Sequence, residues 1–333
     1  MTDKPSPEDF LKLADPLRRE LLAHCYRMLG SVHDAEDTVQ ETYLRAWRGY
    51  DGFEGRSSLR TWLYRIATTA CLTAIDSRGR RPLPTGLGAP SAEATAPLAE
   101  RPEVPWLEPV PDTLVGAGAD DPAQIVTSRE SIRLALVAAL QHLPPRQRAI
   151  LILRDVLRWR AAEVAEVLQT TTAAVNSGLQ RARAQLSEVS PSLDDPVEPL
   201  PQEQREQLDR YVAAFESYDV AAIVELFTKD AVWEMPPYPT WYQGAETIGR
   251  LIETNCPAQR PGDLRLVPAA ANGQPAFGMY LLRGDLHHAF ALPVLTLTSE
   301  GVSHVAMFFD LSLFDTFGLP RTLPAHARAS TGK

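Results

Sequence analysis

The sequence contains few cysteines and no long apolar run, and these absences limit the class of protein. Its three cysteines, Cys25, Cys71 and Cys256, lack the C-x-x-C spacing of a zinc or redox motif, so we expect no metal site and no disulfide framework. No stretch approaches the ~18 apolar residues of a membrane span. No apolar segment follows a basic start, as a signal peptide would require. We therefore expect a cytoplasmic protein without a metal or other cofactor.

The net charge of −9 argues against a nucleic-acid-binding protein, but this charge is unevenly distributed. Residues 127–190 hold nine basic and five acidic side chains, and residues 54–82 hold six arginines. Residues 83–126 hold one basic and seven acidic side chains, and residues 191–333 hold 10 basic and 18 acidic side chains. Two separate stretches are therefore basic enough to contact DNA, while the segments that follow them are acidic.

The chain length of 333 residues predicts two or three domains. The apolar periodicity is helical in two blocks, which a segment rich in proline, glycine and acid separates, and alternating apolar residues follow near the end. We expect helical domains over residues 9–82 and 127–190, a flexible or extended linker over 83–126, and an α+β domain over 200–325. Asp34 is the expected N-cap of a helix in the first block.

A helix-turn-helix pattern lies between Arg160 and Leu186. The second helix has one apolar seam, and the side chains facing away from it suit base edges, whereas flanking arginines suit phosphates. The base-edge candidates are Asn176, Ser177, Gln180 and Arg181, and the phosphate candidates are Arg183, Arg158 and Arg160. A plain helical hairpin with a solvated polar face is the alternative for this pattern alone.

Sequences on both sides of the linker resemble the sigma-70 family of RNA polymerase sigma factors. LPPRQRAILILRD at 143–155, AEVAEVL at 162–168 and VNSGLQRAR at 175–183 resemble region 4. DAEDTVQETYLRAW at 34–47 and RTWLYRIA at 60–67 resemble region 2. The missing middle domain implies the extracytoplasmic-function group. The resemblance implies that region 2 recognises the promoter −10 element and that region 4, through the residues above, recognises the −35 element.

The same resemblance implies two further sets of contacts. Region 2 is expected to grip the clamp of the largest polymerase subunit, with the flap of the second-largest subunit as a further contact. The clamp candidates are Asp37, Gln40, Glu41 and Arg45, for which a solvated helix face is the alternative. The −10 candidates are Arg56, Ser57, Arg60, Trp62, Tyr64, Arg65, Thr68 and Thr69. For Trp62, core packing is an equal alternative.

The −10 sequence preference stays open at Thr69. The family often has Asn at this position, and a hydroxyl cannot make the bidentate contact that Asn makes with adenine.

The linker contains an apolar island among prolines at residues 104–112. Such a stiff segment loses little entropy on docking, so we expect the C-terminal domain to dock there through Trp106, Leu107 and Pro109. That contact would set the placement of the two promoter-binding domains. Packing of Trp106 on its nearest neighbour is the alternative.

FESYDVAAIVELF at 215–227, DAVWEMP at 230–236 and FDLSLFDTFGLP at 309–320 resemble SnoaL-like members of the nuclear-transport-factor-like fold. Helices are expected at about 204–227 and 244–255, followed by antiparallel strands near 277–282, 289–297 and 302–311. The candidate ligand-pocket residues are Trp233, Trp241, His304, Phe308 and Asp310. Because some relatives of this fold are enzymes, catalysis by a carboxylate or His is one hypothesis, and a catalytically silent domain is the favoured alternative.

The sequence as a whole predicts a sigma factor without enzymatic activity, regulated by its own SnoaL-like domain. The expected partners are core RNA polymerase, promoter DNA and a small molecule or protein on that domain. One alternative is a helix-turn-helix repressor that senses a small molecule, but this leaves the region 2 motifs unexplained. Another is an enzyme acting in the C-terminal cone.

Overall fold

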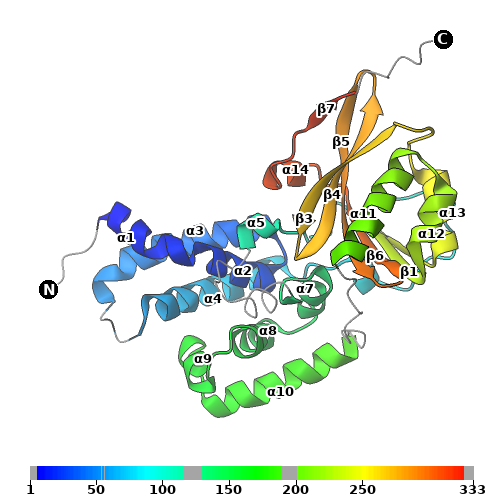
Figure 1. Ribbon diagram of the computed structural model, residues 1–333. Coiled ribbons are helices and arrows are strands. Elements are labelled where there is room, and N and C mark those ends of the chain that lie inside the picture. The colour runs from blue at the N-terminus through cyan, green and yellow to red at the C-terminus, as the bar shows by residue number, and fades with distance from the viewer. Residues whose placement is uncertain (1–5, 54, 56, 116–129, 190–200, 326–333) are drawn as a thin grey trace, which may run out of the picture. The chain divides into compact units, whose positions relative to one another are not determined.

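The computed structural model describes residues 6–53, 55, 57–115, 130–189 and 201–325 (Figure 1). Within these ranges, no helix is long and apolar enough to cross a membrane. Cys25, Cys71 and Cys256 are free thiols in the structure.

The chain folds into two compact units, and each unit combines segments that are distant in sequence. The first consists of residues 1–82 and 107–194, and the second of residues 83–106 and 195–333. The two blocks expected as separate helical domains therefore share one compact unit. The segment expected as a linker is divided directly after Trp106.

The regular elements in the described part of the first unit are helices. Its N-terminal helices, α2 to α4, pack on one another around fully buried side chains that include Leu21, Leu22 and Leu63. The helices before the gap at residues 116–129 are α1 (Pro7–Ala14), α2 (Arg18–Leu29), α3 (Val32–Gly49), α4 (Leu59–Arg78) and α5 (Asp112–Val115). Those after it are α7 (Leu134–Leu140), α8 (Pro145–Leu151), the π-helical turn η4 (Ile152–Val156), α9 (Ala161–Val167) and α10 (Thr172–Val189).

The N-cap of α3 differs from the expectation. Ser31 is the capping residue, and its hydroxyl accepts a hydrogen bond from the Asp34 N–H at 3.1 Å. The prediction that Asp34 caps this helix is therefore wrong. The Ser31 hydroxyl already accepts the N–H of Asp34, which has no partner inside the helix. The Asp34 carboxylate instead pairs with Arg81 at 2.6 Å.

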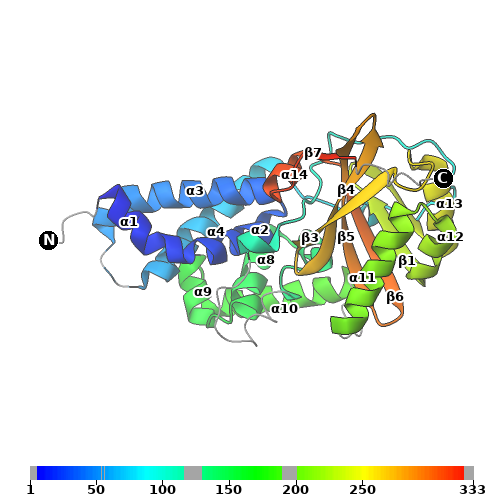
Figure 2. The ribbon, with the colours of Figure 1, turned by 45° about the horizontal axis from the view of Figure 1, so that its top comes forward.

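The second unit is α+β, as predicted, with a curved sheet between helices (Figures 1 and 2). Its helices are α11 (Pro201–Glu216), α12 (Val220–Leu226), α13 (Ala245–Asn255) and α14 (Ser312–Thr316). Its strands are β1 (Phe227–Met235), β2 (Tyr238–Gln243), β3 (Leu264–Ala271), β4 (Gln274–Arg283), β5 (Leu286–Thr298), β6 (Gly301–Phe308) and β7 (Thr322–Pro324).

The sheet runs in the order β2-β1-β6-β5-β4-β3, with β7 added beside β5. The expected antiparallel pairing of β4, β5 and β6 is confirmed, whereas β1 and β6 are parallel. Helices α11, α12 and α13 gather on one side of the sheet in both views, and α14 lies on the other (Figures 1 and 2).

The helix expected over residues 204–227 is interrupted in the structure. Helix α11 ends at Glu216, Tyr218 takes a left-handed conformation with φ of 51°, and Asp219 then caps α12. The Asp219 carboxylate accepts the Ala222 N–H at 3.1 Å, so the second helix has its own start. This break allows two short helices to cover the sheet where one straight helix would run past it.

Gly301 at the start of β6 is a position that only glycine fits. Its φ is +138°, and an added Cβ would lie 2.5 Å from the backbone oxygen of Leu226. Gly284, in the β4–β5 turn, also has a positive φ of +64°, but nothing lies within 4 Å of its added Cβ.

We expect Gly301→Ala to lower the free energy of unfolding by about 3 kcal/mol, because backbone strain and a clash with the backbone add together. The matched control Gly284→Ala should lower it by only about 1 kcal/mol, since conformational strain acts there alone. Thermal unfolding followed by circular dichroism measures both. Equal losses for the two variants would contradict this account.

Candidate nucleic-acid and polymerase interface

Helices α9 and α10 form the predicted helix-turn-helix. Gln169 turns the chain with a φ of 50°, and the Thr171 hydroxyl accepts the Ala174 N–H at 3.1 Å before α10 begins. The apolar seam of α10 is buried through Val175, Leu179 and Ala182. This packing leaves the opposite face of α10 in solvent. The exposed side chains on that face are Asn176, Ser177, Gln180, Arg181 and Arg183.

The arginines of this motif differ in what they already bind. Arg183 forms a bidentate ion pair with Asp155, at 2.7 and 2.8 Å, and these hydrogen bonds raise the pKa of Arg183. Arg160 pairs with Glu163 at 3.2 Å at the start of α9. Arg181 and Arg158 are exposed, and among the described residues neither side chain forms an ion pair. These two are therefore the arginines most available to a nucleic acid.

Several −10 candidates on α4 are not at the surface. Tyr64 and Thr68 are buried, and the Thr68 hydroxyl lies 2.9 Å from Nε2 of His24. Burial lowers the pKa of His24 to about 3, so this histidine is neutral at ordinary pH. Tyr64 and Thr68 therefore belong to the core of the first unit in this conformation.

Trp159, which precedes α9, covers this part of α4. Its ring lies 5.1 Å from the Tyr64 ring, and the Arg60 guanidinium lies over both rings, at 5.0 Å from Tyr64 and 5.7 Å from Trp159. Glu20 completes the arrangement with a 2.8 Å ion pair to Arg60. Sequence reasoning missed Trp159 and Glu20, because only the tertiary fold brings them to α4.

The other −10 candidates lie closer to solvent. Trp62 is half-buried and stacks on Phe53, with ring centroids 4.8 Å apart, so it belongs to a small aromatic cluster and not to the fully buried core. Ser57 and Arg65 are half-buried and Thr69 is exposed. Arg56 lies outside the described residues.

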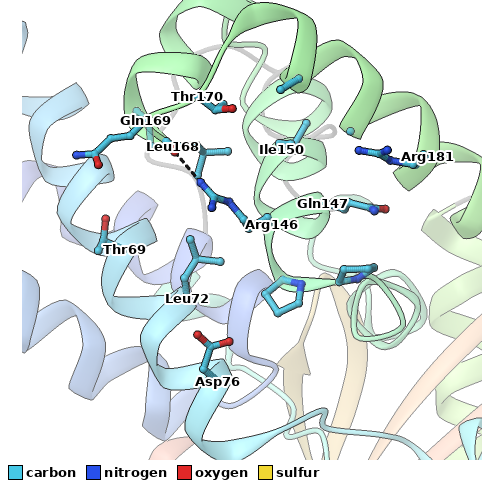
Figure 3. Close-up of a pocket in the computed structure, with 15 residues that line it drawn as sticks. Thr69, Leu72, Asp76, Arg146, Gln147, Ile150, Leu168, Gln169, Thr170 and Arg181 are labelled. Carbon is cyan, nitrogen blue, oxygen red and sulfur yellow. Dashed lines mark hydrogen bonds between the residues drawn. The ribbon is translucent and has the colours of Figure 1, made fainter.

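Thr69 and Arg181 line one hollow of about 650 Å³ (Figure 3). Thr69 comes from α4 and Arg181 from α10, and Arg146 of α8 reaches between them to the Leu168 carbonyl at 2.8 Å. One candidate for each promoter element thus faces the same space.

The candidates for polymerase binding share one helix, α3. Asp37, Gln40 and Arg45 are exposed, whereas Glu41 is half-buried and pairs with Arg45 at 2.7 Å. This face is polar and charged along the helix.

Residues 83–106 form a loop whose two ends meet between Pro82 and Leu107, and this meeting point is called the neck. The Leu107 N–H donates to the Pro82 carbonyl at 3.1 Å, so the chain leaves and re-enters the first unit at one place. Leu107 and Pro109 are buried in that unit. Trp106 is half-buried, and its indole N–H donates to the Arg101 carbonyl at 2.9 Å.

The loop is built into the second unit along the edge strand β2. The Ser91 N–H donates to the Trp241 carbonyl, and the Trp241 indole donates to the Gly88 carbonyl, both at 2.8 Å. The Arg101 N–H donates to the Pro237 carbonyl at 2.9 Å. Ala94 joins the apolar core of the unit. Of the flexible or extended linker expected over 83–126, this stretch is extended and packed, because the free edge of a sheet has hydrogen-bonding groups to satisfy.

The five pocket candidates in the second unit make different contacts. Trp233 lies in the apolar core beneath the helices, and Trp241 binds the loop. His304 pairs with Glu234 at 2.7 Å. Phe308 is buried outside that core cluster, and Asp310 accepts the Ser312 N–H at 2.9 Å at the start of α14.

Two carboxylates that sequence reasoning missed hold the loop at its ends. Glu234 is fully buried and accepts the Thr85 N–H at 3.0 Å. Glu108, directly after the neck, accepts hydrogen bonds from the Ser31 hydroxyl and the Val32 N–H at the start of α3. The signal for Glu234 was an acidic residue between Trp233 and Met235 in the apolar second half of β1, and for Glu108 an acidic residue in a proline-rich segment.

Comparisons with known proteins give three family matches along the chain. Residues 13–81 match Sigma-70 region 2, residues 133–186 match Sigma-70, region 4, and residues 208–310 match a SnoaL-like domain. The crystal structure of the Mycobacterium tuberculosis extracytoplasmic function sigma factor SigJ is similar, with a TM-score of 0.60 and 24% sequence identity. This similarity covers 93% of this chain and 100% of that one, and it supports the fold alone.

Sequence relatives agree with these matches. M. tuberculosis ECF RNA polymerase sigma factor SigJ is 31% identical over 246 residues, covering 72% of this chain and 70% of its own. M. tuberculosis ECF RNA polymerase sigma factor SigG is 60% identical over 316 residues, covering 95% of this chain and 85% of its own. This chain therefore belongs to the extracytoplasmic-function sigma factors of RNA polymerase, and it carries a SnoaL-like domain after the two sigma regions.

Proposed function

We propose that this chain binds core RNA polymerase in the cytoplasm, recognises the −10 and −35 promoter elements and is regulated by its own SnoaL-like domain. The single observation that carries promoter recognition is the exposed face of α10, with amide, hydroxyl and guanidinium groups opposite a buried seam. Those groups match the donors and acceptors of base edges in a major groove. The chain's membership of the sigma factor family supports the same role.

The polymerase contact is proposed on the polar face of α3. Asp37, Gln40 and Arg45 are exposed and project from a helix that the rest of region 2 holds in place. This face is the proposed binding site for the clamp of the largest polymerase subunit. The flap of the second-largest subunit is the proposed partner of region 4.

Regulation by the C-terminal unit is proposed because the segment between the two sigma regions is part of that unit. The loop over residues 83–106 contributes Ala94 to the core and at least four backbone hydrogen-bonding groups to the unit's strands and helices. A change in the unit therefore acts on a segment whose flanking residues, Pro82 and Leu107, belong to the first unit. Among the pocket candidates, His304 pairs with Glu234, and Glu234 also accepts the Thr85 N–H of the loop, so we favour a structural role for this pair.

The first prediction concerns assembly. Purified full-length protein should co-elute with core RNA polymerase on gel filtration and should start run-off transcription from a subset of a random promoter library. The selected promoters should share two conserved elements, because two sigma regions read them. Core polymerase alone is the control, and the absence of a complex would contradict the proposal.

The second prediction concerns base recognition by α10. Gln180→Ala and Arg181→Ala should each change the preferred −35 sequence, since a good base contact contributes ~1–3 kcal/mol of discrimination. Arg158→Ala should instead weaken binding to all promoters alike, because a phosphate contact carries no sequence information. Ser187→Ala, near the far end of α10, is the matched control and should change neither. Equal, sequence-independent losses from the first three variants would show that this face does not read bases.

The third prediction concerns the C-terminal unit. Deletion of residues 200–333 and the substitution Trp106→Ala should shift in vitro transcription in the same direction. The deletion removes the partners of the loop, and Trp106→Ala removes the hydrogen bond to the Arg101 carbonyl, next to the Arg101 N–H that donates to Pro237. Pro105→Ala, at an exposed neighbouring position, is the control and should leave transcription unchanged. Transcription equal to wild type from both the deletion and the Trp106 variant would refute the regulatory role.

A further inference from the structure

Glu108 lies at the start of α3 although it belongs to the segment between the sigma regions. Its Oε2 atom accepts hydrogen bonds from the Ser31 hydroxyl at 2.8 Å and the Val32 N–H at 3.1 Å. The same oxygen lies 3.0 Å from Nδ1 of His33. The first N–H groups of a helix have no partner inside the helix, so Glu108 supplies one from outside. A carboxylate at this end also interacts favourably with the helix dipole.

The backbone of Glu108 binds the preceding helix as well. Its N–H donates to the Gly30 carbonyl at 2.9 Å, and its carbonyl accepts the Tyr26 hydroxyl at 2.7 Å. Gly30 is the C-cap of α2, in a left-handed conformation. One residue thus joins the end of α2, the turn after it and the start of α3.

Arg81 connects this cluster to the neck of the loop. Its guanidinium contacts Asp34 of α3 at 2.6 Å and Oε1 of Glu108 at 3.4 Å. All three side chains are less than one-fifth exposed, so water screens their charges only in part. Arg81 directly precedes Pro82, which accepts the Leu107 N–H that closes the neck. A displacement of the neck would therefore move Glu108 and Arg81 together.

We propose that Glu108 is a positioning residue for polymerase binding, which holds the first turn of α3 and couples that helix to the loop gripped by the C-terminal unit. This inference rests on the proposed function, because α3 carries the candidates for the polymerase contact. The loop is held in the second unit by Glu234 at Thr85 and by Asn255, whose side-chain amide donates to the Ala94 carbonyl at 3.0 Å. If the loop loosens at these two contacts, the change in its position is transmitted to the start of α3 through the neck and Glu108.

The test uses the full-length chain and two measurements, hydrogen exchange of the amides at residues 32–35 and affinity for core polymerase. Glu108→Ala should raise the exchange rate at the first turn of α3 about tenfold, equivalent to ~1.4 kcal/mol, and should weaken polymerase binding by a similar factor. Glu108→Gln should restore part of both, because its amide oxygen still accepts from the Val32 N–H while the charge toward Arg81 is lost. Glu103→Gln, which alters an exposed carboxylate of the loop, should leave both measurements at wild-type values.

Coupling to the C-terminal unit is tested with Asn255→Ala. Alone, this variant should raise exchange at the first turn of α3 and change polymerase affinity. Combined with Glu108→Ala, it should add nothing further, because the connection is already broken. Additive effects would overturn the coupling.

A merely structural role gives a different pattern. In that case Glu108→Ala would raise exchange across the whole first unit and leave the affinity of the folded fraction unchanged, and the positioning role would be refuted. Wild-type exchange and wild-type affinity in Glu108→Ala would also refute it. If the wild-type chain does not bind core polymerase at all, the proposed function fails, whereas the exchange data still decide whether Glu108 holds α3.

Discussion

The hydrogen bond between the Leu107 N–H and the Pro82 carbonyl closes the loop between the sigma regions, and much of the structure depends on this closure. It converts a segment rich in proline and glycine into a loop with one point of entry. Because the ends meet, residues 83–106 can form part of the second unit while the chain on either side stays in the first. Its backbone hydrogen bonds along β2 and the burial of Ala94 offset part of the entropy lost in ordering such a segment.

The two sigma regions meet through polar groups that are costly to bury. Arg27 of α2 donates to the Ser131 carbonyl and hydroxyl, and Arg148 of α8 donates to the Met28 carbonyl. Burial lowers the pKa of each guanidinium to about 10, and within the described part of the chain no carboxylate pairs with either. Neutral oxygen acceptors compensate a buried charge less well than a carboxylate does. The contact between the regions is therefore less favourable than its apolar surface alone would make it.

The same contact determines which promoter candidates are accessible. With Trp159 over Tyr64 and Arg60, part of the proposed −10 surface is covered, whereas Thr69 and the outer face of α10 stay open. Chemical suitability for DNA and access to DNA are thus separate properties here. The residue types on α4 decide the first, and the packing of region 4 on region 2 decides the second.

The sequence by itself determined the three blocks, their helical or α+β character, the helix-turn-helix and the exposed polar face of α10. These features are local, since apolar periodicity, turn residues and caps act over a few neighbouring residues. Motifs at 34–47 and 143–155 were specific enough to identify the family, which the relatives then confirmed. Only the tertiary structure decided that Trp159 covers Arg60 and that Glu108 and Glu234 hold the ends of the loop. Each of these contacts joins residues far apart in the chain. The geometry of such pairs is set by how whole helices and strands pack, and no local pattern encodes it.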